Sequence, residues 1–321
     1  NSIFSHSYHI EDNIKDEYND IRANVGLIAY DTVSIVNSIF ENSHTNKSGA
    51  LSFAIWNVYD NVVNISNSTF RNNFGFRSGA IRTAGFTTIN IENSKFYNNT
   101  SMNDGIFNNA GDLTSDGVKY HTHITCNKCY FENPYNNDYH EKVSGKIITS
   151  SGYGDNIISN SVINNFKYGD LYRSYYSKIK TLNTTFSNMS LNGPLMSLLN
   201  ENESFEFDNC EFKNIDIKHE EYGLIYTNKN SGNLKISDST FSNITSYNAA
   251  VILTEINFGN NVEFYKNKFE DVYSRNGIIV IKNEDLGTGT DNYNGIYINN
   301  CEFKNCSSAK SCKSIKKIIL K

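Results

Sequence analysis

Apolar and polar residues alternate in short segments along the whole chain, and one such segment recurs at intervals of 23 to 36 residues. Each copy is centred on a large apolar residue preceded, two positions earlier, by a small one, as in NSTFRN at residues 67–72. The eleven centres are Phe4, Phe40, Phe70, Phe96, Phe131, Ile163, Phe186, Phe212, Phe241, Phe269 and Phe303. A spacing of two places residues on one face of a strand, and a repeat of this length is typical of solenoids.

The segments on either side of each centre complete the repeat. Apolar pairs such as Val63 and Ile65 precede the centre, and a glycine followed by aliphatic residues, such as Gly79-Ala80-Ile81, comes after it. One copy therefore predicts three short strands joined by corners, with matching residues stacked at about 4.8 Å. Because crossovers between parallel strands are right-handed, we predict an all-β chain that folds as a single-stranded right-handed parallel β-helix of about eleven coils. It would occupy residues 1–305, with residues 306–321 as a cap or linker.

Asparagine occupies the position two residues after most centres. We expect this column to point inward and to stack as a ladder of side-chain amides, which donate and accept hydrogen bonds at once. Its members are Asn42, Asn72, Asn98, Asn133, Asn165, Asn188, Asn214 and Asn243.

Six cysteines invite a search for disulfides and metal ligands. Cys126 and Cys129 form a CxxC pair, but both fall in inward columns, as do Cys210 and Cys301, so we expect four buried thiols. Cys306 and Cys312 are the best candidates for a disulfide. No second ligand pair accompanies the CxxC, so we expect no metal site and no cofactor.

Charge and composition narrow the choice of partners. The net charge is −5 and the pI is near 5.8, which gives no footprint for nucleic acid. No apolar run is long enough to insert in a membrane. Several Asn-x-Ser/Thr sites permit glycosylation. We expect an extracellular, secreted glycoprotein, and the start of the chain within a repeat favours a fragment of a larger protein.

Candidate binding residues are aromatic rather than catalytic. Carboxylates are scattered over different coils, and none of the short motifs of β-helical pectin hydrolases or pectate lyases is present, so we expect no enzyme. Loop tyrosines can stack on sugars or anchor a protein partner. The candidates for contact with a partner are Tyr135, Tyr139, Tyr172, Tyr175, Tyr176 and Tyr222.

Two families share this style of repeat. The segment FRNNFGFRSGAI at residues 70–81 resembles the repeats of polymorphic outer-membrane adhesins, which are parallel β-helices. The Asn-, Tyr- and Lys-rich repeats, with CEFKN and STFSN, resemble the β-helical scaffoldins of anaerobic-fungal cellulosomes. That resemblance implies a large secreted protein whose cohesin modules bind the dockerins of enzymes.

Three functions follow from these observations. The first is a non-catalytic extracellular scaffold module that binds dockerin modules of secreted enzymes acting on plant cell walls. The second is a β-helix protein that binds or cleaves a plant polysaccharide. The third is a surface adhesin. A partner pull-down and incubation with uronic-acid polymers would distinguish the first two.

Overall fold

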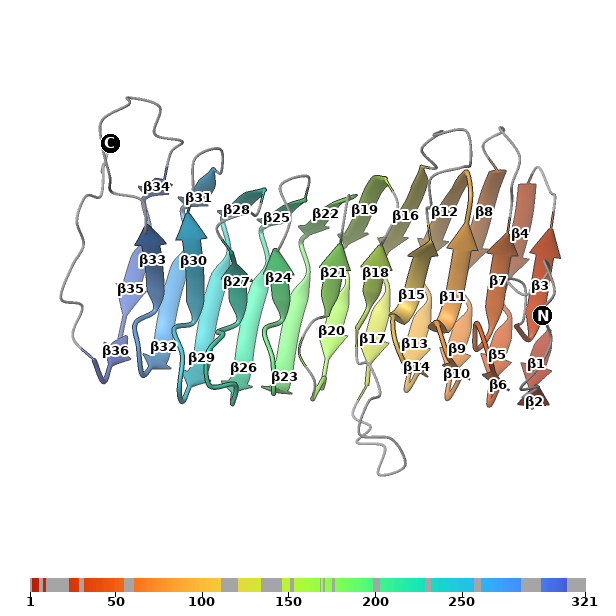
Figure 1. The fold of residues 1–321 in the computed structure, drawn as a ribbon, viewed down its shortest axis with the longest axis horizontal. Coiled ribbons are helices and arrows are strands. Elements are labelled where there is room, and N and C mark those ends of the chain that lie inside the picture. Colours follow the sequence, from red (N-terminus) through yellow and green to blue (C-terminus); the bar gives the residue numbers. More distant parts are fainter. Residues whose placement is uncertain are drawn as a thin grey trace. The chain divides into compact units, whose positions relative to one another are not determined.

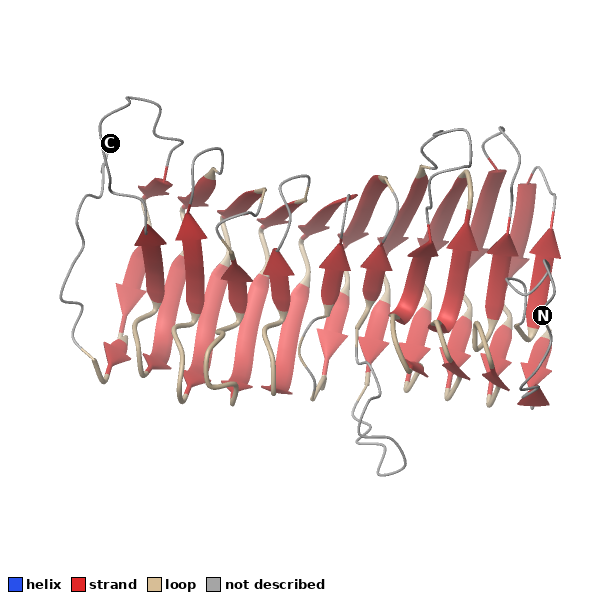
Figure 2. Cartoon of the chain, viewed as in Figure 1, coloured by secondary structure: helices blue, strands red, loops and turns tan. Residues whose placement is uncertain are grey.

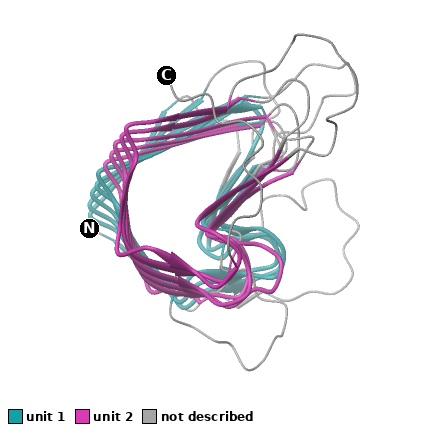
Figure 3. Cartoon of the chain, turned by 90° about the vertical axis from the view of Figure 1, so that its left-hand side faces the viewer, with its two compact units in different colours: residues 1–162, 171–177 teal, residues 163–170, 178–321 magenta. Residues whose placement is uncertain are grey.

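The described part of the chain consists of strands, turns and loops. The computed structural model describes residues 2–5, 8–9, 23–28, 32–54, 61–110, 121–133, 146–150, 153–167, 169, 171–174, 177–198, 203–228, 232–256, 261–283 and 296–310. Within these residues every regular element is a β-strand (Figure 2). The chain forms two compact units, residues 1–162 with 171–177 and residues 163–170 with 178–321 (Figure 3), and each is described separately.

Unit 1 contains parallel sheets that we call A, B, C and D (Figure 1). Sheet A holds β1 (Ile3–Ser5), β5 (Ile39–Glu41), β9 (Thr69–Arg71), β13 (Lys95–Tyr97) and β17 (Tyr130–Glu132). Sheet B holds β2 (Tyr8–His9), β6 (His44–Thr45), β10 (Phe74–Gly75) and β14 (Thr100–Ser101). Sheet C holds β3 (Val25–Ile28), β7 (Leu51–Ala54), β11 (Ser78–Ala84), β15 (Gly105–Ala110), β18 (Ile148–Ser150) and β21 (Tyr172–Ser174). Sheet D holds β4 (Thr32–Val36), β8 (Asn61–Ser66), β12 (Thr87–Glu92), β16 (Thr122–Asn127) and β19 (Gly154–Ser159).

Unit 2 repeats sheets A, C and D with longer strands in sheet A. This sheet holds β23 (Thr185–Leu191), β26 (Glu211–Ile217), β29 (Thr240–Ser246), β32 (Lys268–Ser274), β35 (Glu302–Lys304) and β36 (Ser307–Ser308). Its sheet C holds β24 (Met196–Leu198), β27 (Ile225–Thr227), β30 (Ile252–Ile256) and β33 (Ile279–Asn283). Its sheet D holds β22 (Ser177–Leu182), β25 (Ser204–Asp208), β28 (Asn233–Ser237), β31 (Val262–Tyr265) and β34 (Ile296–Asn299). The division between the units falls within β20 (Val162–Asn164).

The phenylalanine centres stack in files, as the repeat predicts. In unit 1, Phe70 pairs in register with Phe96, their ring centroids lie 4.9 Å apart, and both side chains are fully buried. In unit 2, the Phe212 and Phe241 centroids lie 4.6 Å apart with nearly parallel planes. Successive coils add parallel strands to sheets A, C and D, so each unit is a right-handed parallel β-helix and the predicted fold class is confirmed.

The predicted orientation of the asparagine column is wrong. With the exception of Asn133, its members adopt left-handed backbone angles, as at Asn72 (φ 55°) and Asn214 (φ 55°), and lie at an outward corner after the sheet A centre. Asparagine suits this corner because it tolerates the left-handed region better than other non-glycine residues. The amides still form chains: Asn72 Nδ2 donates to Asn42 Oδ1 at 3.3 Å, and Asn243 Nδ2 donates to Asn214 Oδ1 at 2.8 Å.

The interior asparagine ladder lies one residue later in the sequence. Asn73 and Asn99 are buried, and the Asn73 amide donates to Asn99 Oδ1 at 2.9 Å. Asn99 also donates to the Phe70 carbonyl at 2.9 Å, and the buried Asn133 donates to the Asn99 carbonyl at 3.3 Å. These hydrogen bonds satisfy backbone carbonyl groups next to the corner that follows sheet A.

The cysteines differ from the prediction at the CxxC pair. Cys126 and Cys129 form a disulfide across the corner between sheets D and A of unit 1, so they are not the free thiols that we expected. Strand parity placed each of them inward but gave no distance across the corner. Cys210 is a buried free thiol, as expected, whereas Cys301 is free but only partly buried. Cys306 is free as well, and Cys312 lies outside the described residues.

Candidate functional site

The outer face of sheet C in unit 1 carries polar and basic side chains in one column. Arg82 pairs in register with Ser52 on one side and with Asn108 on the other, and Thr149 pairs with Asn108 and with Arg173. Each alternates with buried inward residues, as Arg82 does with Ile81 and Thr83, so the column faces away from the core. The column therefore crosses five successive coils of unit 1.

This face lies on the indented side of the coil outline (Figure 3). Arg82 is only 7% exposed and Asn108 5%, although both point away from the interior. The Thr149 hydroxyl donates to the backbone carbonyl of Asp104, which lies in the turn before β15. The corner between sheets B and C thus covers part of the column.

Basic side chains surround Asp104 in this corner. The Arg77 guanidinium lies 3.8 Å from the Asp104 carboxylate, and Lys146 Nζ donates to the neighbouring Asn103 carbonyl at 3.1 Å. Arg82 and Arg173 lie close enough to act on Asp104 electrostatically. We call Arg77, Arg82, Lys146 and Arg173 the basic cluster.

The balance of charge in the cluster favours anions. Burial raises the pKa of the Asp104 carboxyl, while the positive charges of Arg77, Lys146, Arg82 and Arg173 oppose that rise. Among the described residues, four cations and one carboxylate meet at this corner, on a chain whose net charge is −5. Clustered charges of one sign raise the local concentration of oppositely charged ligands.

One polar atom beside the cluster has no hydrogen-bond partner among the described residues. It is the buried Oδ1 of Asn108, which lies between Arg82 and Thr149 in the column. A buried acceptor without a donor is costly. The accessible part of the cluster offers cations for an anion.

The tyrosine candidates differ in burial. Tyr172 is fully buried in unit 1, so it is not a residue that contacts a partner at the surface. Successive residues of a strand point to opposite faces, so Tyr172 faces inward and Arg173 outward. The alternation was not evident in the sequence because several tyrosines follow one another there. Tyr222 is half-buried in unit 2, with its ring centroid 4.3 Å from that of Tyr226. The remaining candidates, Tyr135, Tyr139, Tyr175 and Tyr176, lie outside the described residues.

The sequence patterns did not identify the basic cluster. Arg77 and Arg82 flank a glycine corner in one coil, whereas Lys146 and Arg173 belong to later coils. The sequence signal for the cluster was the presence of arginines at outward positions of sheet C. Recognising that they share one column required the strand register.

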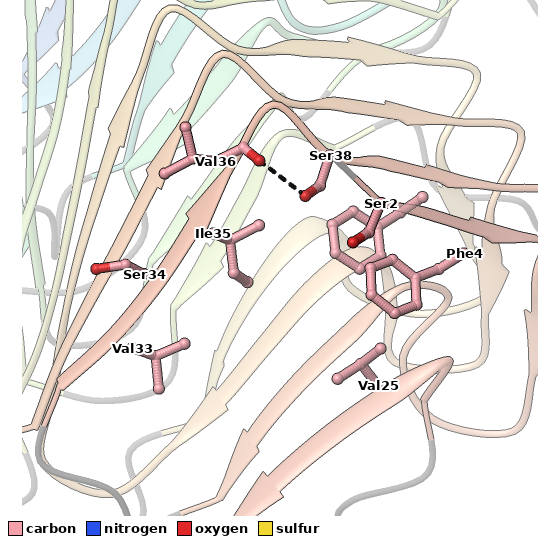
Figure 4. Close-up of a pocket in the computed structure, with 9 residues that line it drawn as sticks. Ser2, Phe4, Val25, Val33, Ser34, Ile35, Val36 and Ser38 are labelled. Carbon is pink, nitrogen blue, oxygen red and sulfur yellow. Dashed lines mark hydrogen bonds between the residues drawn. The ribbon is translucent and has the colours of Figure 1, made fainter.

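A cavity of about 380 Å³ lies at the first two coils of unit 1 (Figure 4). Its walls are mainly apolar, with Phe4, Val25, Ile35 and Phe40 among them, and the nearby Ser38 hydroxyl donates to the Val36 carbonyl at 3.0 Å. Among the described residues, its lining consists of apolar side chains and serines, so they supply no titratable group for acid–base chemistry.

Among the described residues, no three His, Cys, Asp or Glu side chains converge as ligands for a metal ion. No helix in the described ranges has the length and apolar character needed to cross a bilayer.

Comparison with known proteins reveals a structural similarity. No family model and no curated protein sequence matches the chain. Among solved structures, the chain is similar to the A-module of the mannuronan C-5 epimerase AlgE4 from Azotobacter vinelandii. The sequence identity is 10% and the TM-score 0.28, with 86% of this chain and 88% of the epimerase chain covered.

That comparison corrects one expectation. The similar structure is that of an enzyme, which contradicts the prediction that the chain is not an enzyme, and we do not retain that prediction. At this identity and TM-score the similarity transfers no catalytic residue and no substrate to the chain.

Proposed function

We propose that this β-helix protein binds an acidic polysaccharide on the outer face of sheet C in unit 1. The observation that carries the proposal is the basic cluster around Asp104. A guanidinium group matches the planar geometry of a carboxylate, so arginine suits the uronic acids of plant polymers.

The arrangement of the column supports a linear polymer. Arg82 and Arg173 belong to strands three coil steps apart, so they lie on the order of 14 Å apart along the stack. Asn108 and Thr149, both buried, lie between them in the column. A ligand with regularly spaced carboxylates would meet the cations of several coils at once.

A protein scaffold is the second candidate. The repeat style shared with cellulosomal scaffoldins favours it, as does the half-buried aromatic group around Tyr222 in unit 2. In this proposal the chain is an extracellular, secreted segment that binds dockerin modules. Pull-down with purified dockerin-bearing enzymes tests it, and retention of none of them would count against it.

The polysaccharide proposal is tested by titrating the protein with polygalacturonate. The variant Arg77→Gln/Arg173→Gln removes two partly exposed cations of the cluster. We expect it to weaken binding about a hundredfold, at roughly tenfold for each charge-assisted contact of about 1.4 kcal/mol. Binding by the wild type should weaken with added salt, because exposed charges are screened.

The matched control is Lys180→Gln/Lys235→Gln on the outer face of sheet D in unit 2. These lysines flank Glu206, with Nζ–carboxylate distances of 3.1 and 3.7 Å. The control removes the same charge from the chain, so it should leave polygalacturonate binding unchanged. Equal losses in the two double variants would refute a site at the cluster. Analysis of the incubated polymer for shortened or altered chains shows whether binding leads to turnover.

A further inference from the structure

One corner of unit 2 is longer than its neighbours. The connection from sheet A to sheet C spans residues 218–224 in the coil of β26 and β27, which is seven residues. The corresponding connections are four residues at 192–195, five at 247–251 and four at 275–278. The extra residues include the segment HEEY at residues 219–222. A local insertion in a regular coil is a feature that the stacking itself does not require.

The insertion is held in one conformation by its own histidine. His219 Nδ1 accepts hydrogen bonds from the backbone N–H groups of Glu221 and Tyr222, at 3.1 and 3.0 Å. An accepting Nδ1 carries no proton, so the ring proton is on Nε2. The His219 ring stacks on Tyr222, with centroids 5.1 Å apart and planes 15° apart, and Tyr222 packs on Tyr226. A preorganised group of rings loses little freedom when it binds.

Tyr226 joins the insertion to the outer face of sheet C. Its hydroxyl donates to Glu255 Oε2 at 3.3 Å, and Lys282 Nζ lies 3.5 Å from Glu255 Oε1. Burial raises the pKa of Tyr226 to about 12, and the Glu255 carboxylate adds to the rise. Burial and Glu221 likewise raise the pKa of Tyr222. Both phenols therefore remain neutral hydrogen-bond donors at ordinary pH.

Carboxylates act on both tyrosines: besides burial, Glu221 and Glu255 raise the pKa of Tyr222 and of Tyr226, while Lys218 begins the corner and Lys282 pairs with Glu255. Glu220 and Glu221 are exposed in the insertion, and neither makes an ion pair with another described residue. Aromatic rings bordered by carboxylates attract ammonium and guanidinium groups, because the ring faces carry partial negative charge. Tyrosine is also among the residues that contribute most to protein interfaces.

We infer that the corner at residues 218–224, with Tyr226, is a docking site for a protein partner that presents lysine or arginine side chains. The aromatic group provides the apolar contact, and Glu220 and Glu221 pair with the partner's cations. A corner that carries an insertion suits a macromolecular partner better than a single sugar ring, which requires a recess. The inference concerns unit 2 alone and does not depend on polysaccharide binding by unit 1.

Selection from a phage-displayed library of random dodecapeptides on the immobilised full chain tests the inference. We expect selected peptides to be rich in lysine and arginine. Their synthetic versions should bind Tyr222→Ala about tenfold more weakly than the wild type, which corresponds to about 1.4 kcal/mol. Glu220→Gln/Glu221→Gln should have a similar effect, and it alters only exposed side chains, so folding is preserved.

Two controls and one competing ligand complete the experiment. Tyr247→Ala removes a 50% exposed tyrosine from the next corner, and Glu263→Gln removes a carboxylate from sheet D, so neither should change peptide binding. Selection without an excess of basic residues, or equal binding to all variants, would overturn the inference. Perturbation of the Tyr222 ring signals by cellohexaose but not by a selected peptide would also overturn it, because the site would then be one for sugars. Polygalacturonate binding should be unchanged in the Tyr222 variant, which separates this site from that in unit 1.

Discussion

Truncation of one ring in the phenylalanine file tests the physical basis of the fold. Phe96 is fully buried in unit 1 and contacts three rings, with centroid distances of 4.9 Å to Phe70, 5.1 Å to Phe131 and 4.9 Å to Phe107. Replacing a buried phenylalanine with alanine costs about 3–5 kcal/mol in transfer and cavity energy. Each lost ring pair adds about 0.5–1.5 kcal/mol beyond the buried area. We therefore expect Phe96→Ala to lower the free energy of unfolding by at least about 5 kcal/mol, the lower end of this sum.

The assay combines urea unfolding with hydrogen exchange. Because each coil contacts mainly its neighbours, destabilisation should be strongest near the substitution. Amide protection should fall most in β9, β13 and β17, which carry the adjoining rings. Phe76→Ala is the control, since Phe76 is 40% exposed. A loss in Phe96→Ala no greater than in the control would refute the view that the ring file holds the coils together.

Three further predictions concern a corner, the disulfide and an exposed carboxylate. Asn214→Ala should cost about 1 kcal/mol in urea unfolding because alanine is strained at φ 55°, whereas Asn214→Gly should cost only a few tenths; equal effects would contradict this account. Cys126→Ala/Cys129→Ala should lower the free energy of unfolding by only about 2 kcal/mol, because a disulfide that closes a very short loop restricts the unfolded chain little. An unchanged urea midpoint would refute this prediction. Hydrogen bonds from Lys268 and Lys304 lower the pKa of Glu270 to about 2. The ionised Glu270 therefore stabilises the folded state above pH 4.5, and this contribution is lost as the pH falls from 4.5 towards 2. Carboxyl NMR titration checks this value, and Lys268→Gln should raise it.

The central prediction of the sequence analysis succeeded because it depended on local geometry. Alternation within a strand has a period of two, so Ser68 and Phe70 had to share a face, and recurrence of the pair had to place Phe70 next to Phe96. The parity failed at Asn72, where a left-handed backbone turns the chain. The alternation of inward and outward residues does not continue through a residue with this backbone conformation. Asn72 therefore points outward and Asn73 inward.

The candidate sites required information that no single coil contains. Arg82 and Arg173 are far apart in the sequence, and their shared column depends on the lengths of the connections between them. The length of the insertion before β27 was visible in the sequence, but the stacking of His219 on Tyr222 was not. Side-chain clusters on an outer face arise from register, which every intervening loop can shift.

The sequence by itself determined the coil and the residues that form its core, because hydrophobic burial and strand alternation act over a few neighbouring positions. Only the tertiary structure decided which outward side chains meet, including the cations around Asp104 and the rings of the long corner. It also decided that Cys126 and Cys129 are close enough to bond. Such contacts depend on distances across corners and between coils, and residue type alone does not specify these distances.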